Sequence, residues 1–205
     1  MTALHISADA DWLKKASDVV LHGGVVAVAF ERLFGLAADA LDADAVARSA
    51  AIKDRPTHEM GTKPIAVILP SIDYVNLVST GLGERARALA NRYWPGPLTL
   101  LVPAREGIPL PLVGPGGLIG VRVPGPSLAL QLARHTRKVL TATSANRRGA
   151  DEPLHSQELI HLAGVDMVVA GEVAGPPGST IVIADGGELN VIRQGIISIS
   201  MGDAQ

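Results

Sequence analysis

Val139-Leu-Thr-Ala-Thr-Ser-Ala-Asn-Arg-Arg-Gly149 is the stretch on which the predicted fold depends. Its first half contains β-branched and aliphatic residues, which favour a strand. Its second half favours a turn, because Ser144 and Asn146 can bond their own backbone and Gly149 accepts a positive φ. A strand that ends in a hydroxyl and an amide places polar groups at a sheet edge. In open α/β sheets such an edge is where ligands bind.

The composition predicts an aliphatic core and short connections. The chain has 205 residues, of which 47% are hydrophobic, but only two each of Trp, Tyr and Phe. It also contains 22 Gly and 14 Pro, so tight turns are frequent. This mix is typical of an α/β sheet. We therefore predict a single α/β domain over residues 1–205.

Charge and cysteine content exclude several classes of site. The net charge of −2 gives no global attraction to nucleic acid, although Arg134, Arg137, Lys138 and residues 147–148 can form a local basic patch. Without cysteine there is no disulfide framework or thiolate nucleophile, and the six His show no metal-binding spacing. No apolar run is long enough for a membrane span, so we expect a soluble, cytoplasmic protein.

Apolar runs predict strands, and amphipathic periodicity predicts helices. The predicted strands are 25–30, 64–69, 98–102, 118–123, the start of 139–149, 167–170, 179–184, 189–193 and 196–199. The predicted helices are 9–22, 42–51 capped by Asp42, 83–93, 128–134 capped by Ser127, and 157–163. Residues 34–39 are expected to lead away from the first strand, 57–62 and 106–117 to be loops, 94–97 a rigid corner, and 185–187 a hairpin turn.

Two pairs of polar residues have both a structural and a functional interpretation. Lys53 and Arg55 can be a solvated helix end, or a cationic pair that grips phosphate or carboxylate. Ser144 and Asn146 can be turn residues, or hydrogen-bond partners of a phosphate or ribose. Sequence alone does not choose between these interpretations.

Two arginines stand in apolar strand patterns. Arg122 interrupts the run 118–123, where an unpaired charge would cost several kcal/mol. It therefore needs either an internal acid or an anionic ligand. Arg193 ends the run 189–193 in a similar setting.

Taken together, nine motifs in order resemble the YrdC/YciO-like family of threonylcarbamoyl-AMP synthases. They are 23–28 (GGVVAV), 35–39 (GLAAD), 53–56 (KDRP), 63–69 (KPIAVIL), 94–99 (WPGPLT), 120–124 (GVRVP), 143–146 (TSAN), 178–181 (GSTI) and 192–195 (IRQG). The resemblance covers residues 9–199. The pairing of KxR with SxN is the functional signature of that family.

The resemblance implies a twisted mixed open sheet with flanking helices around a deep basic cavity. It also implies that threonine, bicarbonate and ATP, with Mg²⁺, give threonylcarbamoyl-AMP and pyrophosphate, which makes the chain a nucleotidyltransferase. The product serves N6-threonylcarbamoyl modification of adenosine in tRNA, so tRNA-modification proteins, and tRNA or double-stranded RNA, are the expected partners. The residues implied around the nucleotide are Lys53, Arg55, Ser144, Asn146 and Arg193, with Lys53 and Arg55 catalytic. The residues implied around the amino acid are Arg122, Ala142 and Arg32.

The chain departs from the family pattern on the amino-acid side. The usual Pro-Thr-Glu-Thr-x-Tyr-Gly run is 29–35 (AFERLFG) here, and Arg32 replaces a threonine that contacts the substrate in the family. Lys63 stands where Asn is typical, and Ile68 where His is frequent. Arg32 would either block threonine or bind its carboxylate.

Three hypotheses follow from this pattern. The chain is a threonylcarbamoyl-AMP synthase that tolerates the changes; or a diverged paralogue that uses another amine or carbamoyl substrate; or a nucleotide- or RNA-binding module without catalysis.

Overall fold

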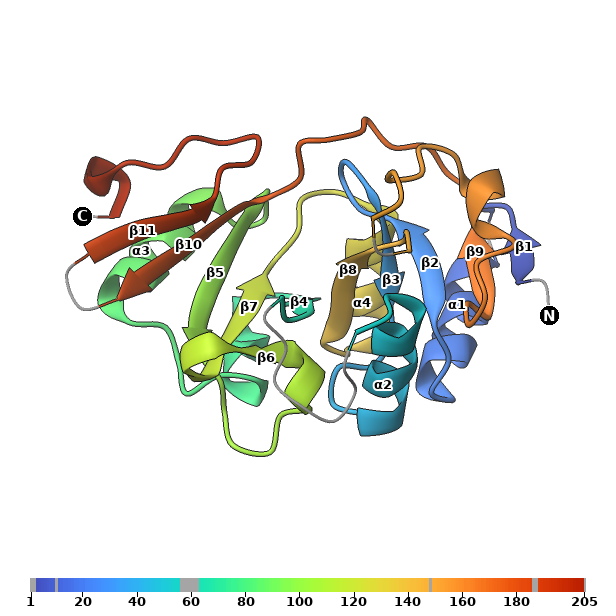
Figure 1. Cartoon of the computed structure of the whole chain (residues 1–205), viewed down its shortest axis with the longest axis horizontal. Helices are drawn as coiled ribbons and strands as arrows, with labels where there is room; N and C mark the ends of the chain where they lie inside the picture. The colour runs from blue at the N-terminus through green and yellow to red at the C-terminus, as the bar shows by residue number, and fades with distance from the viewer. Residues whose placement is uncertain (1–2, 10, 56–62, 148, 186–187, 205) are drawn as a thin grey trace.

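The computed structural model describes residues 3–9, 11–55, 63–147, 149–185 and 188–204. The described residues form a mixed sheet of eleven strands with helices on both faces (Figure 1). In spatial order its strands are β1 (Leu4–Ile6), β9 (Met167–Val169), β2 (Val26–Ala29), β3 (Phe34–Ala37), β8 (Leu140–Ser144), β4 (Ala66–Ile68), β7 (Leu118–Arg122), β5 (Leu98–Pro103), β10 (Thr180–Asp185) and β11 (Glu188–Arg193), while β6 (Val113–Gly114) pairs with β7.

The sheet mixes parallel and antiparallel pairs. β8 lies at its middle, antiparallel to both β3 and β4. On one side, β2 pairs with β3 antiparallel and with β9 parallel. On the other side, β7 pairs with β4 parallel and with β5 antiparallel. The strand predicted at the start of residues 139–149 therefore joins the two halves of the sheet.

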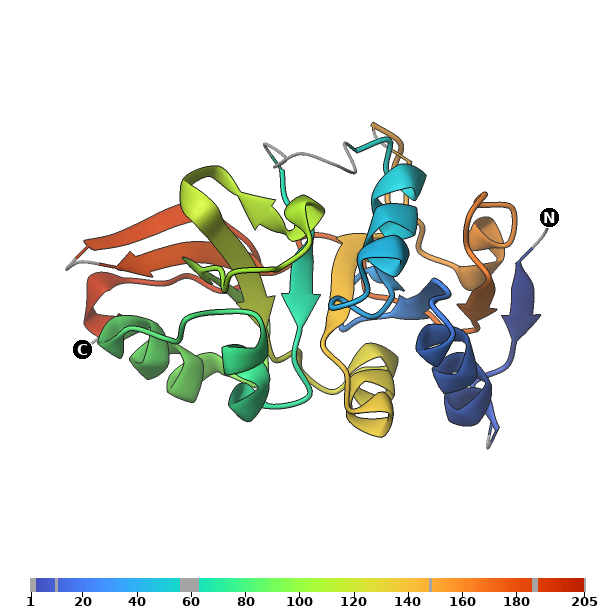
Figure 2. The same cartoon turned by 90° about the horizontal axis from the view of Figure 1, so that it is seen from below.

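Four α-helices cover the sheet within the described residues. They are α1 (Trp12–Leu21), α2 (Ala43–Ile52), α3 (Glu84–Tyr93) and α4 (Leu128–Thr136). Figures 1 and 2 show α1, α3 and α4 on one face and α2 on the other. The predicted caps are confirmed: the Asp42 carboxylate accepts from the N–H groups of residues 44 and 45, and the Ser127 hydroxyl accepts from that of residue 130.

The core is aliphatic, as the composition predicts. The largest fully buried side chains are Leu and Ile, apart from Phe34. β2 is buried at every residue because helices cover both faces of this part of the sheet, which explains why its sequence is a continuous apolar run.

Most predicted elements are confirmed, and four predictions are wrong. Residues 34–37 form β3, which pairs back onto β2. Residues 157–163 contain only a short 3₁₀ helix, Ser156–Leu159. Residues 196–199 are not a strand, because β11 is the edge of the sheet and the Ile197 carbonyl instead accepts from the Thr180 and Gln194 side chains. The predicted loop 106–117 contains β6 and two 3₁₀ turns.

Other predictions lie partly outside the described residues. The loop 57–62 and residue 148 of the predicted basic patch are among these. So is the centre of the turn 185–187, although β10 and β11 pair antiparallel on either side of it. β1 was not predicted.

The corner at 94–97 is held by hydrogen bonds, in agreement with its predicted rigidity. The Trp94 indole donates to the Leu98 carbonyl at 2.7 Å, and Gly96 N–H donates to the Val123 carbonyl at 2.9 Å. α3 therefore ends at this corner and β5 begins beside β7.

The connection between β9 and β10 positions one wall of the candidate site. This connection, residues 170–179, joins the two halves of the sheet and runs along one long edge of the molecule in Figure 1. It brings residues 175–179 close to the β2–β3 turn, which lies more than 140 residues earlier in the chain.

Candidate functional site

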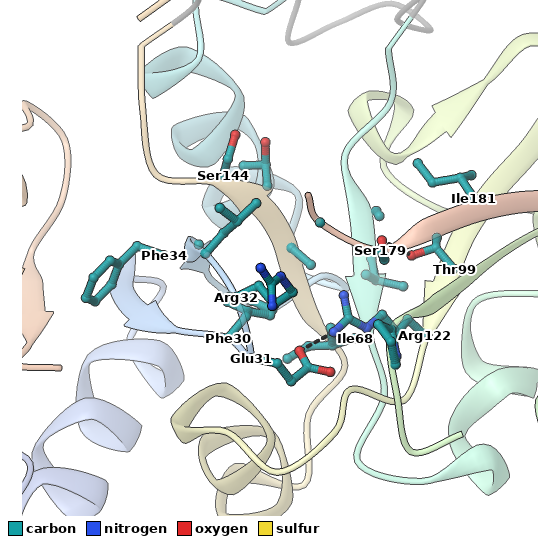
Figure 3. A pocket seen from close by; sticks show the side chains of 18 of the residues that line it. Phe30, Glu31, Arg32, Phe34, Ile68, Thr99, Arg122, Ser144, Ser179 and Ile181 are labelled. Atoms are coloured by element: carbon teal, nitrogen blue, oxygen red, sulfur yellow. Dashed lines mark hydrogen bonds and ion pairs between the residues drawn. The ribbon is translucent and has the colours of Figure 1, made fainter. Parts of the chain in front are cut away.

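A cavity of about 210 Å³ opens between the two halves of the sheet (Figure 3). Its lining comes from the β2–β3 turn, β4, β7, β8 and the β9–β10 connection. Its charged lining residues are Arg32, Arg55, Arg122, Arg193, Glu31 and Glu152. Four guanidinium groups against two carboxylates give the lining a net positive formal charge, which favours an anionic ligand.

Lys53, Ser144 and Asn146 form one hydrogen-bonded cluster at the edge of this cavity. Lys53 follows the last turn of α2 and is only 5% exposed. Its ammonium donates to the Ser144 hydroxyl at 3.2 Å and to the side-chain and backbone oxygens of Asn146, both at 2.5 Å. Ser144 itself donates to the Asn146 side-chain oxygen at 2.7 Å. The three hydrogen bonds of the Lys53 ammonium thus hold the turn that follows β8.

The environment of Lys53 lowers its pKa to about 8. The main cause is burial, which disfavours the ammonium form, and the charge of Arg55 adds to it, while Glu152 opposes it. A lysine with this pKa changes its charge just above neutral pH. Its attraction for an anion is therefore sensitive to pH.

Arg55 lines the cavity two residues beyond Lys53. Its Nη1 donates to the Lys63 carbonyl at 2.7 Å, so this side chain links the residue that follows α2 by three positions to the start of the segment leading into β4. The predicted cationic pair therefore flanks the cavity from the end of α2.

Arg122 has an internal acid, which was one of its two predicted partners. It pairs with Glu31, and its Nε donates to the Gly96 carbonyl at 3.0 Å. Glu31 also accepts from Gly125 N–H at 2.5 Å. The side chains of this pair are only 13% and 17% exposed. Figure 3 shows the pair at one end of the cavity, away from Ser144.

Arg193 is anchored to the β9–β10 connection. Its Nε and Nη2 donate to the Ser179 carbonyl at 3.2 and 2.9 Å, and Nη2 also reaches the Ser179 hydroxyl. That hydroxyl lies 2.9 Å from the hydroxyl of Thr99 on β5. Burial is the largest cause of a lowered Arg193 pKa, which Glu152 partly offsets.

Arg32 and Ala142 complete the predicted set. Ala142 lies in the middle of β8 and lines the cavity. Arg32 lies in the β2–β3 turn, lines the same cavity and hydrogen-bonds to the β9–β10 connection. All eight predicted residues therefore gather at one place: six line the cavity, and Lys53 and Asn146 contact it through Ser144.

Several lining residues were missed by sequence reasoning. Glu31 carried a signal, because it is a charge that directly follows a buried apolar run. Thr99 and Ser179 also carried one, because they lie in the motifs 94–99 and 178–181, whereas Glu152 carried none.

The residues fit Mg²⁺ only as an ion carried by a nucleotide. Among the described residues, no three His, Cys, Asp or Glu side chains group closely enough to hold a metal ion. Mg²⁺ bound with nucleotides commonly takes its ligands from phosphates, water and one or two carboxylates. Glu152 is the cavity carboxylate that could serve in this way, since Glu31 is paired with Arg122.

Two residues of the predicted basic patch are engaged within the protein. Lys138 pairs with Asp39 at 2.8 Å, and Arg134 donates to the Pro70 carbonyl. None of the helices in the described part of the chain is long and apolar enough to cross a bilayer.

Comparison with known proteins gives consistent matches. The family model Sua5_yciO_yrdC, described as "Telomere recombination", matches residues 18–195. A threonylcarbamoyl-AMP synthase of Chromobacterium violaceum is 36% identical over 156 residues, which are 76% of this chain and 78% of that protein. A threonylcarbamoyl-AMP synthase of Pyrococcus abyssi is 33% identical over 144 residues, or 70% of this chain, but only 41% of that protein. The chain therefore spans less than half of the Pyrococcus relative.

Solved structures show the same fold. The crystal structure of P. abyssi Sua5 complexed with L-threonine superposes with a TM-score of 0.81 at 27% identity, over 95% of this chain and 58% of that one. The crystal structure of E. coli YciO superposes with a TM-score of 0.80 at 20% identity, over 96% and 97% of the two chains, which supports the fold alone.

Proposed function

The chain belongs to the Sua5/YciO/YrdC family, and from this membership we propose that it makes threonylcarbamoyl-AMP from L-threonine, bicarbonate and ATP with release of pyrophosphate. Because this reaction transfers the AMP group of ATP to the carbamate, the protein would be a nucleotidyltransferase. Its product would serve threonylcarbamoyl modification of tRNA, with tRNA-modification proteins as its users. We propose a cytoplasmic location on the same basis.

One observation carries this proposal: the KxR and SxN residues, far apart in sequence, meet at a single positively lined cavity. The Lys53–Ser144–Asn146 cluster, with Arg55 beside it, supports binding of the ATP phosphates at this wall. L-threonine is the ligand of the solved P. abyssi Sua5 structure, which supports threonine as the amine substrate.

The reaction needs no nucleophile from the protein. Condensation of the threonine amine with bicarbonate gives a carbamate and water. A carbamate oxygen then attacks the α-phosphorus of ATP, and the bond from that phosphorus to the bridging oxygen of pyrophosphate breaks. Lys53 and Arg55 would position the phosphates and stabilise the charge that develops on them. When bound with ATP, Mg²⁺ supplies further neutralisation of phosphate charge.

Pyrophosphate release from ATP and bicarbonate, with each amino acid supplied in turn, tests this function. We expect release with L-threonine. Release only with another amine would support the diverged-paralogue hypothesis, and ATP binding without release would support a non-catalytic module.

Arg55→Ala gives the residue-level test. A donor aimed at developing charge contributes about 3–4 kcal/mol, so we expect a loss of roughly a hundredfold or more in kcat. Arg105→Ala is the matched control, because Arg105 is an exposed arginine whose side chain donates to the Asn76 carbonyl and which lies outside the cavity lining. Normal turnover by the Arg55 variant would contradict the charge-stabilising role.

A further inference from the structure

The Arg32 guanidinium is fixed in place by the β9–β10 connection. Its Nε donates to the Pro177 carbonyl at 2.9 Å and its Nη2 to the Pro176 carbonyl at 3.2 Å. The Arg32 carbonyl in turn accepts from Gly175 N–H at 2.8 Å. Both ends of the residue are thus tied to the same three-residue segment. A side chain held in this way loses little conformational entropy when it binds a ligand.

The charge of Arg32 is not balanced by an ion pair within the described part of the chain. Its two side-chain partners are neutral carbonyls, and no carboxylate of the described residues forms an ion pair with it. Its neighbour in sequence, Glu31, forms an ion pair with Arg122 and accepts a hydrogen bond from Gly125 N–H. An arginine has five N–H donors, so three remain after the two bonds to the connection.

The surroundings of Arg32 strengthen its attraction for an anion. The cavity wall near it is apolar, with Phe30 and Ile68, and Ile68 is about 1% exposed. Electrostatic interactions are stronger beside such a low-dielectric wall than in water. Of the two arginines at the amino-acid side of the cavity, Arg122 is already neutralised by Glu31, whereas Arg32 is not.

We propose that Arg32 binds the carboxylate of the amine substrate, so that this chain selects amines that carry a carboxylate. The planar fork of a guanidinium matches the two oxygens of a carboxylate. Of the two alternatives that the sequence left open for Arg32, the geometry thus points to carboxylate binding rather than to a block. This assignment rests on the proposed function, because it presumes an amino-acid substrate in this cavity.

Calorimetric binding of L-threonine and of L-threonine amide, without ATP, tests the proposal. The amide keeps the amine and side chain but lacks the negative charge. A charge-assisted hydrogen bond contributes enough that we expect wild-type protein to prefer threonine by roughly ten- to a hundredfold. In Arg32→Ala this preference should fall to within about threefold. Arg105→Ala, which changes an exposed arginine outside the cavity lining, should keep this preference.

A second variant protects the test against misfolding. Arg32→Gln keeps an N–H donor at the position of the Arg32 Nε, which bonds the Pro177 carbonyl, but removes the charge. It should therefore lose the preference while its thermal unfolding stays near that of wild type. Retention of the preference in either folded variant would overturn the proposal. So would equal binding of threonine and its amide, or binding of neither, by the wild-type protein. Loss of ATP affinity in Arg32→Gln with the threonine preference intact would also overturn it, and would assign Arg32 to the nucleotide.

The outcome is separable from that of the proposed function. Pyrophosphate release with an unchanged preference in the Arg32 variants would leave the function standing and remove this role. An Arg32-dependent preference without pyrophosphate release would do the reverse.

Discussion

Lys53 Nζ lies 3.2 Å from Ser144 Oγ, although 91 residues separate the two in sequence. The contact joins the end of α2 to the end of β8, the middle strand of the sheet. It makes one unit of two short motifs, each of which alone is compatible with an ordinary helix end or turn. The chemistry proposed for the cavity depends on this unit.

ATP affinity is expected to fall as the pH rises through the Lys53 pKa of about 8. Below that pH the side chain is an ammonium that attracts phosphate, and above it the side chain becomes neutral. Bound phosphate favours the ammonium form of Lys53, so the decrease in ATP affinity is shifted toward higher pH. Between about pH 7.5 and about pH 9.5 the phosphates themselves no longer change charge, because their second pKa is near 6.

The measurement is the Kd for ATP over this range, in wild type and in Lys53→Met. The Met variant should bind weakly at all these pH values, with a flat profile. An equal decline in both proteins would show that another group is responsible.

Asn146→Ala should weaken ATP binding by roughly tenfold without unfolding the protein. The change removes one acceptor from the Lys53 ammonium and also the bond from Nδ2 to the Ala150 carbonyl, so the turn after β8 is no longer fixed. Titration with ATP measures the effect. Ser127→Ala is the control, because it removes the α4 cap and costs about 1 kcal/mol in stability. If both variants lose ATP affinity equally, the effect of Asn146 is one of stability alone.

How far the sequence predicts this molecule depends on the range of the contacts involved. Strands such as β2 and β5 were predictable, because an apolar run bounded by Gly or Pro is a local signal. β3 was not, because it has only four residues, contains Gly35 and follows two charges. Its strand conformation comes from pairing with β2 and β8 rather than from its own composition.

The same distinction applies to the site. The cationic pair Lys53 and Arg55, and the amide of Asn146, could be predicted as nucleotide-binding residues. Their residue types suit a phosphate, and the family resemblance supported this role. The partner of Arg122 was left open between an acid and a ligand, since only the three-dimensional sheet brings the β2–β3 turn to the end of β7. The contact of Ser179 with Arg193 was not predictable either, because it forms across a strand pair.

The Glu31–Arg122 pair should show strong coupling in a double-mutant cycle. Its side chains are 13% and 17% exposed, so removal of one partner leaves a charge with little solvent. Urea unfolding of Glu31→Gln, Arg122→Met and the double variant should give a coupling free energy of about 1–3 kcal/mol.

The Arg48–Asp166 pair is a matched control for this cycle. It has the same chemistry at 2.8 Å, but its side chains are 44% and 39% exposed. Exposed pairs contribute about 0.2–1 kcal/mol, so its coupling should be the smaller of the two. Equal coupling in the two cycles would mean that burial does not set the strength of the cavity pair.

Gly195→Ala should destabilise the fold by about 1–3 kcal/mol, because a Cβ at this position has no room. It would lie 2.4 Å from backbone atoms of residues 178, 179 and 180, which cannot move aside as a side-chain tip could. Those residues end the β9–β10 connection and begin β10, so the strain falls on the wall that holds Arg193. Gly83→Ala is the control, since no atom lies within 4 Å of its Cβ, and it should change the free energy of unfolding by less than about 1 kcal/mol. Urea unfolding measures both, and equal effects would show that the close approach at Gly195 relaxes without cost.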